Sequence, residues 1–495
     1  MAPPAASALN RRQAGILLHP TSLPGPYGCG ALGDESFRFI EFLVAAGQAL
    51  WQMLPLGPTH DNGSPYQCLS VHAGNPRLIC FDRLVQCGWL EPGDAAPRAA
   101  DRAATLAEAR SGFQARASAE ERAAFDAFMA AEQDWLADYA LFQALRAHHG
   151  GLDWARWPAA LRDREATALD KARRKHRAAV ERACFEQFVF HRQWSEVRAA
   201  ANRRGISIIG DMPIFVAHDS VDVWANRSLF ELDDAGRPTV VAGVPPDYFS
   251  ATGQRWGNPH YRWKLMEESG FAWWMQRIER QMKMFDLVRI DHFRGFEAYW
   301  EIPADHPTAM GGRWVEGPGG RFFDAVLKRF GTLPFVAEDL GLITPPVHAL
   351  REQYGLPGMR ILQFAFDGGS DNPYLPHNHT RNSVVYTGTH DNDTSLGWHE
   401  ALDATARARV HEYLGKPEEP MPWALIRAAL ASVADTAVIP LQDALGLGTS
   451  CRMNTPGTTE HNWLWRFDWG QVAPDLATRL RQMGGLYGRT PPAGG

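Results

Sequence analysis

Four carboxylates stand where short apolar runs of the sequence end, at Asp211, Asp291, Glu338 and Asp391. A carboxylate beside a buried strand is costly unless it is paired or hydrogen-bonded, so each is either a structural ion-pair residue or a chemical group. If the runs are strands of one barrel, their carboxyl ends meet and the four acids converge on one mouth. Converging carboxylates with no evident metal site favour glycosyl chemistry.

Retaining glycosyl chemistry needs two carboxyl groups in opposite protonation states. One acid protonates the departing oxygen while the other, as a carboxylate, attacks the anomeric carbon. Arg289, two residues before Asp291, can keep that carboxylate ionised. We expect nearby negative charge and partial burial to raise the pKa of Glu338 and keep it protonated. Asp391 is then available to stabilise developing positive charge or to hold sugar hydroxyls.

Other interpretations of these residues stay open at this point. An Asp that follows an apolar strand is commonly a turn or cap residue. His390, Asp391 and Asp393 could bind a hydrolytic metal, although the chain has no H-E-x-x-H motif. His19 and His292 could be core histidines with satisfied hydrogen bonds. The coincidence of several acids at strand ends is what favours chemistry.

Eight apolar runs predict eight strands of a parallel sheet that is buried on both faces. Helix-like segments lie between most of them, including 33–47, 272–285 and 322–330. This alternation predicts an α/β fold, a (β/α)8 TIM barrel. A doubly wound open sheet is the alternative, but it lacks its glycine-rich dinucleotide turn here. The runs span residues 15–22, 50–58, 206–216, 287–293, 335–341, 358–367, 383–393 and 436–446.

We expect a single catalytic barrel domain over residues 1–495 that carries large, mainly helical insertions. About 150 residues separate the second and third runs, far more than a βα connection needs. Their richness in Ala, Arg and Glu predicts a mainly helical subdomain over residues 60–200. Residues 215–262, rich in Gly, Pro and aromatics, are expected to form a lid over the mouth, and residues 297–333 a short insertion.

The composition is that of a globular protein and argues against several classes of partner. Hydrophobic residues make up 45 % and charged residues 21 % of the chain, with a formal net charge of -6. This mildly acidic charge, without a basic tract, argues against nucleic acid and anionic membranes. The N-terminus lacks the apolar segment of a secretory signal. The six cysteines form no metal-binding spacing, so we expect reduced thiols in a cytoplasmic protein and no metal.

Longer motifs resemble those of amylomaltases, the bacterial 4-alpha-glucanotransferases of glycoside hydrolase family 77 in the alpha-amylase clan, related to plant disproportionating enzymes. They run in order over residues 15–468: "GILLHPTSLPGPYGCGALG", "GDMPIFV", "VPPDYFS", "TGQRWGNP", "RIDHFRGF", "AEDLG", "YTGTHDNDT" and "RMNTPGT". The resemblance implies retaining transfer of an alpha-1,4-glucan segment to the 4-hydroxyl of another glucan or glucose. It implies no cofactor.

The resemblance also implies roles for single residues. Asp291 matches the nucleophile, Glu338 the general acid/base and Asp391 the transition-state stabiliser. Arg289 and His390 match residues that orient the nucleophile and bind the sugar at the point of cleavage. Residues 247–250 match a lid loop. The other positions that match substrate-binding residues are Tyr66, Asp211, Tyr248, Phe249, Ser250, Gln254, Trp256, Asn258, His292, Phe364 and Asn454.

One segment departs from the family pattern, because Cys68, His72 and Arg77 stand where other residues are expected.

Three rival functions are a hydrolase with the same acids, a non-catalytic glucan-binding protein and a metal-dependent barrel hydrolase. A binding protein has no use for a matched nucleophile and acid. We therefore expect a glucanotransferase of maltooligosaccharide, starch or glycogen metabolism, with alpha-1,4-glucan substrates, as a monomer or homodimer.

Overall fold

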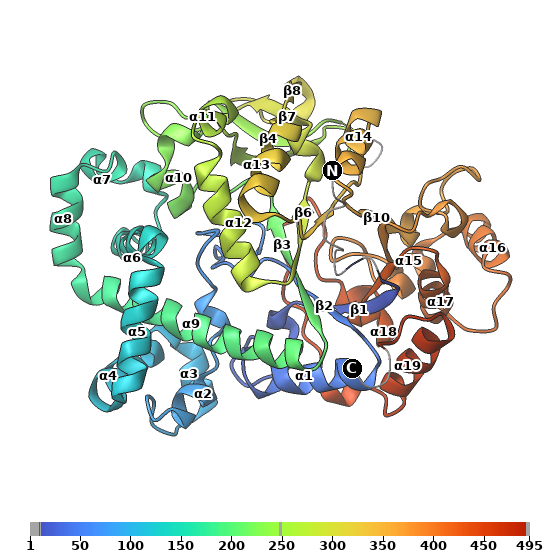
Figure 1. Ribbon diagram of the computed structural model, residues 1–495, viewed down its shortest axis with the longest axis horizontal. Helices are drawn as coiled ribbons and strands as arrows, with labels where there is room; N and C mark the ends of the chain where they lie inside the picture. The colour runs from blue at the N-terminus through green and yellow to red at the C-terminus, as the bar shows by residue number, and fades with distance from the viewer. Residues whose placement is uncertain (1–8, 10, 247–249, 492–495) are drawn as a thin grey trace.

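The structure is a computed structural model that describes residues 9, 11–246 and 250–491. Its centre is one parallel sheet of eight strands in the order β10-β11-β12-β1-β2-β3-β6-β9 (Figure 1). All eight apolar runs contribute a strand, as predicted. The strands are β1 (Gln13–Leu17), β2 (Leu50–Gln52), β3 (Ser207–Pro213), β6 (Leu287–Asp291), β9 (Phe335–Ala337), β10 (Gly358–Ile361), β11 (Ser383–Tyr386) and β12 (Thr436–Pro440).

The sheet curls into a nearly closed barrel. Its two edge strands, β9 and β10, meet where the backbone N–H of Ala337 donates to the carbonyl of Pro357 (2.9 Å). Strands β1 and β2 approach so closely that a Cβ at Gly15 would lie 2.5 Å from the Leu50 Cβ, so that position requires glycine. The predicted (β/α)8 barrel is confirmed, and the open doubly wound sheet is excluded.

Side chains from all eight strands pack into one buried apolar cluster. Such a shared cluster is expected of a barrel whose interior is a packed core. A separate and larger core surrounds the barrel and joins it to the helices. The strand side chains in the shared cluster are Leu17, Leu50, Ile209, Leu287, Val336, Met359, Ile361, Val384, Tyr386 and Val438.

Helices cover the barrel between most successive strands (Figure 1), whereas the connection from β10 to β11 contains only short 3-10 turns. The first, α1 (Asp34–Ala45), shows why: Phe39, Ile40 and Leu43 recur on one buried face, and acidic Asp34 and Glu35 suit its positive N-terminal end. The others outside the β2–β3 connection are α10 (Val221–Ala225), α11 (Trp263–Glu268), α12 (Ala272–Met284), α13 (Gly320–Phe330), α14 (Pro345–Gln353), α15 (Ser395–Ala401), α16 (Ala404–Tyr413), α17 (Trp423–Ala431), α18 (Leu441–Ala444) and α19 (Leu476–Leu486).

The long connection between β2 and β3 is helical, and most of its helices gather to one side of the barrel (Figure 1). Aromatic rings of α4, α5 and α9 pack together there, with Phe113, Phe125 and Phe188 at 5.3–5.9 Å between centroids. The helices are α2 (Phe81–Gln86), α3 (Ala95–Ala100), α4 (Arg102–Arg116), α5 (Ala119–Ala131), α6 (Gln133–His148), α7 (Ala159–Arg162), α8 (Ala166–Lys175) and α9 (Arg177–Arg203).

A second, antiparallel sheet stands beside the barrel mouth in the order β5-β4-β7-β8. Its strands come from the segments after β3 and after β6, and they are β4 (Val240–Val244), β5 (Gln254–Pro259), β7 (Ala298–Pro303) and β8 (Arg313–Glu316). The boundaries 60–200, 215–262 and 297–333 stay predictions.

The C-terminal segment is fastened to the amino end of the barrel by one buried arginine. Arg489 is fully buried, and its guanidinium donates to the backbone carbonyls of Gln13, Leu430, Ser432, Ala434 and Asp435 at 2.7–3.1 Å.

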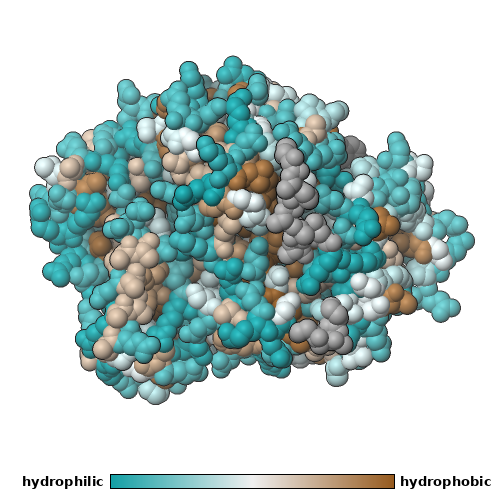
Figure 2. Space-filling model, in the orientation of Figure 1, coloured by the Kyte–Doolittle hydropathy of each residue, from teal (hydrophilic) through white to brown (hydrophobic). Residues whose placement is uncertain are grey.

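Hydrophilic side chains predominate on the face drawn in Figure 2. Within the described residues, no helix combines the length and the apolar character needed to cross a bilayer.

Candidate active site

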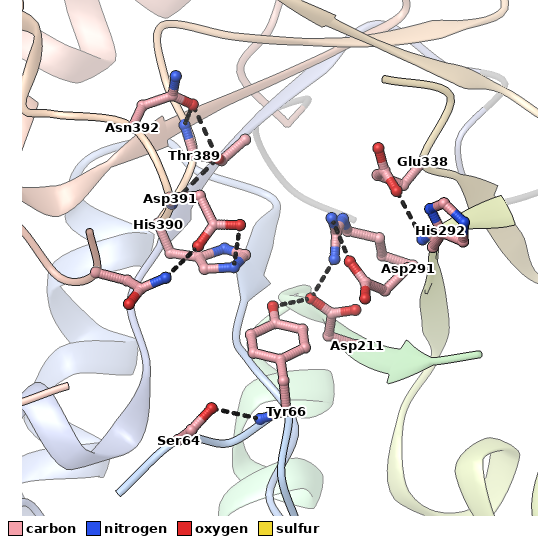
Figure 3. Close-up of polar contacts among 12 residues, drawn as sticks. Ser64, Tyr66, Asp211, Asp291, His292, Glu338, Thr389, His390, Asp391 and Asn392 are labelled. Carbon is pink, nitrogen blue, oxygen red and sulfur yellow. Dashed lines mark hydrogen bonds and ion pairs between the residues drawn. The ribbon is translucent and has the colours of Figure 1, made fainter. Parts of the chain in front are cut away.

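Strand β6 ends in the ion pair that the sequence suggested. Arg289 Nη2 lies 2.9 Å from Asp291 Oδ1, and Arg289 Nη1 donates to Asp211 Oδ2 at 2.7 Å. The same Asp211 oxygen accepts a hydrogen bond from the Tyr66 hydroxyl at 2.7 Å. Because β3 and β6 pair in register, with Asp211 opposite Arg289, one guanidinium holds two carboxylates at the mouth (Figure 3).

The Arg289 pair does not hold the pKa of Asp291 at its ordinary value. Burial raises the pKa of Asp291 to about 6, and the charges of Asp211 and Asp391 add to the effect while Arg289 opposes it. The predicted pairing is confirmed, yet desolvation wins over the single guanidinium. A carboxylate with this pKa is mostly ionised at neutral pH.

Glu338 lies immediately after β9 and faces the end of β6. Its Oε2 accepts the backbone N–H of His292 (2.6 Å) and its Oε1 that of Leu340 (3.0 Å). His292 takes a left-handed backbone conformation with φ of 54°, the kind of strain that clusters at functional sites. Burial raises the pKa of Glu338 to about 8, with Asp291 adding to it, so the acid is mostly protonated at neutral pH. This agrees with the expectation from the sequence.

Asp391 follows β11 and lies across the mouth from Asp291 (Figure 3). Partial loss of hydration within the mouth would raise its pKa, but His390 at 3.4 Å and the amide of Asn454 at 2.7 Å hold the pKa of Asp391 well below its usual value. The side chain is 47 % exposed, so its permanent charge is open to a ligand. The mouth therefore combines one permanently ionised acid with two that titrate on either side of neutrality.

Comparison with known proteins gives this arrangement a family. The sequence profile described as 4-alpha-glucanotransferase matches residues 18–471. The chain is 53 % identical to the 4-alpha-glucanotransferase of Thermus thermophilus over 95 % of its own length and 98 % of the relative. The chain belongs to the 4-alpha-glucanotransferase family. A member of this family is a transferase of carbohydrate metabolism, which excludes the rival of a non-catalytic binding protein.

Other relatives of this chain agree. The Synechocystis protein of that name is 48 % identical over 97 % of this chain and 99 % of the relative. The structure of the amylomaltase from Streptococcus agalactiae in complex with acarbose superposes with a TM-score of 0.93 at 38 % identity, covering 97 % of this chain and all of the other. The Corynebacterium glutamicum amylomaltase, at 17 % identity and a TM-score of 0.76, shows the fold alone.

The structure brings most of the predicted site residues together. Tyr66 stacks on His390 with ring centroids 5.1 Å apart and planes at 13°. Trp256 of β5 meets the His292 ring edge-on at 4.8 Å, and its indole N–H donates to Gln254. The catalytic and substrate-binding roles of all these residues stay predictions.

Other predicted residues are placed differently. Asn258 is buried, and its amide donates to the carbonyl of Val216 at 2.8 Å. The Ser250 hydroxyl donates to the carbonyl of Gly253, and Phe364 packs edge-on against Tyr374 at 5.6 Å. Tyr248 and Phe249 lie outside the described residues, as does Asp247.

Sequence reasoning missed two residues of the mouth. Trp463 lies 5.9 Å from the Tyr66 ring and 6.0 Å from the His390 ring, and its backbone is left-handed with φ of 65°. Arg452 donates to the backbone carbonyl of Asp391 at 2.6 Å. Neither follows an apolar strand, so strand-end reasoning had no signal for them.

The alternative of a metal at His390, Asp391 and Asp393 finds no support in the geometry. Asp393 turns away, with one oxygen accepting from the Thr449 hydroxyl at 2.9 Å and the other from the backbone N–H of Thr394 at 2.7 Å. Over residues 9, 11–246 and 250–491, no group of three or more His, Cys, Asp or Glu side chains is arranged to hold a metal ion.

His19 and His292, which the sequence also allowed to be core histidines, can now be placed. His19 and His292 are both buried, and burial lowers the pKa of each to about 3, so both are neutral. Among the residues that the structure describes, His292 Nε2 and His19 Nδ1 find no hydrogen-bond partner. His292 still faces the mouth, since its backbone holds Glu338 and its ring packs on Trp256.

Proposed function

We propose that the protein transfers segments of alpha-1,4-glucans by a retaining double displacement at this mouth. A carboxylate oxygen of Asp291 attacks the anomeric carbon of the donor while Glu338 gives its proton to the departing glycosidic oxygen. The shortened chain leaves, and the 4-hydroxyl of an acceptor glucan or glucose enters. Glu338 takes the proton of that hydroxyl as its oxygen attacks, and the alpha-1,4 bond reforms with Asp291 released.

The main support for this proposal is that two neighbouring carboxyl groups, those of Asp291 and Glu338, have different pKa values. The raised pKa of Glu338 (about 8) and the lower pKa of Asp291 (about 6) leave the first acid protonated and the second ionised at neutral pH. A nucleophile and a general acid need those two states in one site. A purely structural ion-pair cluster has no need of a protonated member.

The remaining residues of the mouth fit supporting roles. Asp391 keeps its negative charge, held by His390 and Asn454, where an oxocarbenium-like centre would develop beside it. Arg289 orients Asp291 through the 2.9 Å contact. The stacked Tyr66 ring offers an apolar face for a sugar.

Glucans and maltooligosaccharides are the substrates we propose. The related amylomaltase from Streptococcus agalactiae was solved with acarbose, which supports an oligosaccharide ligand for the same mouth. We propose that the segment 215–262 acts as a lid, because closure that excludes water would favour an acceptor hydroxyl over hydrolysis. The helical subdomain 60–200 and the insertion 297–333 complete the single catalytic domain.

Location and assembly are part of the same proposal. We place the protein in the cytoplasm, which is supported by six cysteines that are all free thiols in the structure. We propose a monomer or homodimer, which size measurements in solution would distinguish.

Incubation with maltotriose tests the function directly. Glucose and longer maltooligosaccharides should appear while total reducing ends stay constant, because each transfer breaks one bond and forms another. A rising concentration of reducing ends would show that water is the main acceptor, and the protein would then be a hydrolase.

The Asp291→Asn variant tests the nucleophile. It should lose turnover by at least about 10⁴-fold while keeping its circular dichroism spectrum, because the amide preserves size and hydrogen bonding. Retained activity would overturn the assignment.

A further inference from the structure

Two histidines of neighbouring helices converge on each other outside the carboxylate site. The Nε2 atoms of His399 on α15 and His411 on α16 lie 3.2 Å apart, so that without a metal one neutral ring can donate a hydrogen bond to the other, and the ring centroids are 5.3 Å apart. His411 is exposed and His399 half-buried, so solvent reaches both. Neither ring has a part in the transfer reaction.

The separation of the two nitrogens is that of two ligands on one metal ion. Two imidazole nitrogens that each lie about 2.0–2.1 Å from a tetrahedral Zn²⁺ are roughly 3.3 Å from each other. Imidazole suits Zn²⁺, Cu²⁺ and Ni²⁺, whereas Mg²⁺ and Ca²⁺ prefer oxygen. We propose that His399 and His411 form a two-histidine site for a divalent late transition-metal ion, with water completing the coordination.

One charge of each sign lies near His399. Glu400 follows His399 and contributes a negative charge, and Arg407 contributes a positive charge whose effect on the ring is at least as large. The Arg407 guanidinium keeps its charge, but its Nη2 is held by the carbonyls of Glu400 and Leu402 at 2.9 and 3.0 Å and not by the imidazole nitrogens. Burial and the neighbouring His411 lower the pKa of His399, which keeps that ring in the neutral form that binds metal.

A second histidine cluster shows what an unsuitable arrangement looks like. The rings of His148 and His176 are 4.5 Å apart and those of His148 and His149 are 5.0 Å apart. The Lys175 ammonium lies 3.4 Å from His148 Nε2, where a metal would have to bind. The positive charge opposes a second cation at that place, so we expect no metal binding there.

A metal at the proposed site would connect two segments that leave the active-site mouth. Helix α15 begins just after the Asp391 loop and is capped by the Thr394 hydroxyl. Helix α16 holds the loop after β10, because Arg409 donates to the carbonyls of Phe366 and Gly368 at 3.3 and 3.2 Å. Cross-linking the helices stabilises the folded state, since the ion binds that state in preference to the unfolded chain.

Titration of the tag-free full-length protein with Ni²⁺ and Zn²⁺ salts tests the site by calorimetry. We expect one saturable site per chain and a rise in Tm at saturation. Cu²⁺ loaded at one equivalent should show two imidazole nitrogens in its electron paramagnetic resonance. His399→Ala and His411→Ala should each weaken binding by about tenfold or more, because the second imidazole then no longer binds intramolecularly.

Matched controls are His348→Ala, on α14, and His148→Ala, in the second cluster; both should bind like the parent. His411→Gln provides a milder variant should alanine disturb α16. Unchanged affinity in the His399 and His411 variants would overturn the proposal. So would loss of binding in a control variant, or the absence of saturable binding to the parent protein. None of these outcomes depends on the transfer mechanism.

Discussion

The pH dependence of transfer follows from the two titrating acids of the mouth. Turnover needs Asp291 ionised, which is gained as pH rises through about 6, and Glu338 protonated, which is lost as pH rises through about 8. At pH 7 about nine-tenths of each group is in the required form, so about four-fifths of the molecules are competent. We expect kcat/KM to peak near pH 7 and to fall about tenfold by pH 5 and by pH 9.

Burial strongly changes the fraction of molecules that are in the competent protonation state at neutral pH. With ordinary pKa values of 3.8 and 4.5, the pair would have its optimum near about pH 4. Only about 0.3 % of Glu338 would then be protonated at pH 7. Burial in the mouth therefore raises the competent fraction at neutral pH by roughly 250-fold.

The Glu338→Gln variant separates the two limbs of the profile. Glutamine mimics the protonated acid in shape and charge, so the pKa of Asp291 should stay near its parent value. A donor with a good leaving group, such as alpha-maltosyl fluoride, needs no acid in its first step. Single-turnover fluoride release by the variant should keep the acid limb near pH 6 and lose the alkaline limb. The control Glu352→Gln, on the surface, should leave both limbs in place.

Two results would refute this reasoning. An alkaline limb that persists in Glu338→Gln would mean that another group titrates near pH 8. A parent profile whose acid limb lies near pH 4 would mean that burial does not raise the pKa of the nucleophile.

Substitutions at three further positions test the contacts of Asn454, Tyr66 and Arg489. Asn454→Asp puts a carboxylate where an amide N–H now binds Asp391 at 2.7 Å, so kcat on maltotriose should fall at least about hundredfold, and only about tenfold in Asn454→Ala; equal losses would contradict the charge argument. Tyr66→Phe loses the hydrogen bond to Asp211 but keeps the ring, so KM should rise less than about tenfold, and much more in Tyr66→Ala; equal KM values would argue against stacking. Arg489→Met removes the donor that five carbonyls share, of which those of Leu430 and Asp435 keep a second donor in Arg12 and in the backbone N–H of Gln13, and should lower the free energy of unfolding in urea by about 3 kcal/mol or more. An unchanged urea midpoint would show that the hydrogen bonds of Arg489 are dispensable for stability.

Much of the fold could be predicted because buried parallel strands leave a local signal. The run 287–293, for example, begins with Leu287, Val288 and Ile290, interrupted only by Arg289, and then reaches the polar residues Asp291 and His292 at the mouth. Strand-end acids were therefore found without a structure. Trp463 and Arg452 could not be found in this way, because they reach the mouth from an irregular segment after the last strand.

The helical connection between β2 and β3 illustrates a different limit. Its composition predicted helices, and helices are present. The packing of Phe113, Phe125 and Phe188 into one cluster depends on which helices meet, which composition does not specify.

The sequence by itself determined the residue types of the site and their positions at strand ends, since both are properties of short segments. Only the tertiary structure decided their chemistry. Asp291 and Glu338 are 47 positions apart in the chain, and their pKa values diverge because folding buries them beside different neighbours. Likewise, the 3.2 Å approach of His399 and His411 arises from the packing of α15 against α16. Desolvation and distance between remote residues act only in the folded chain.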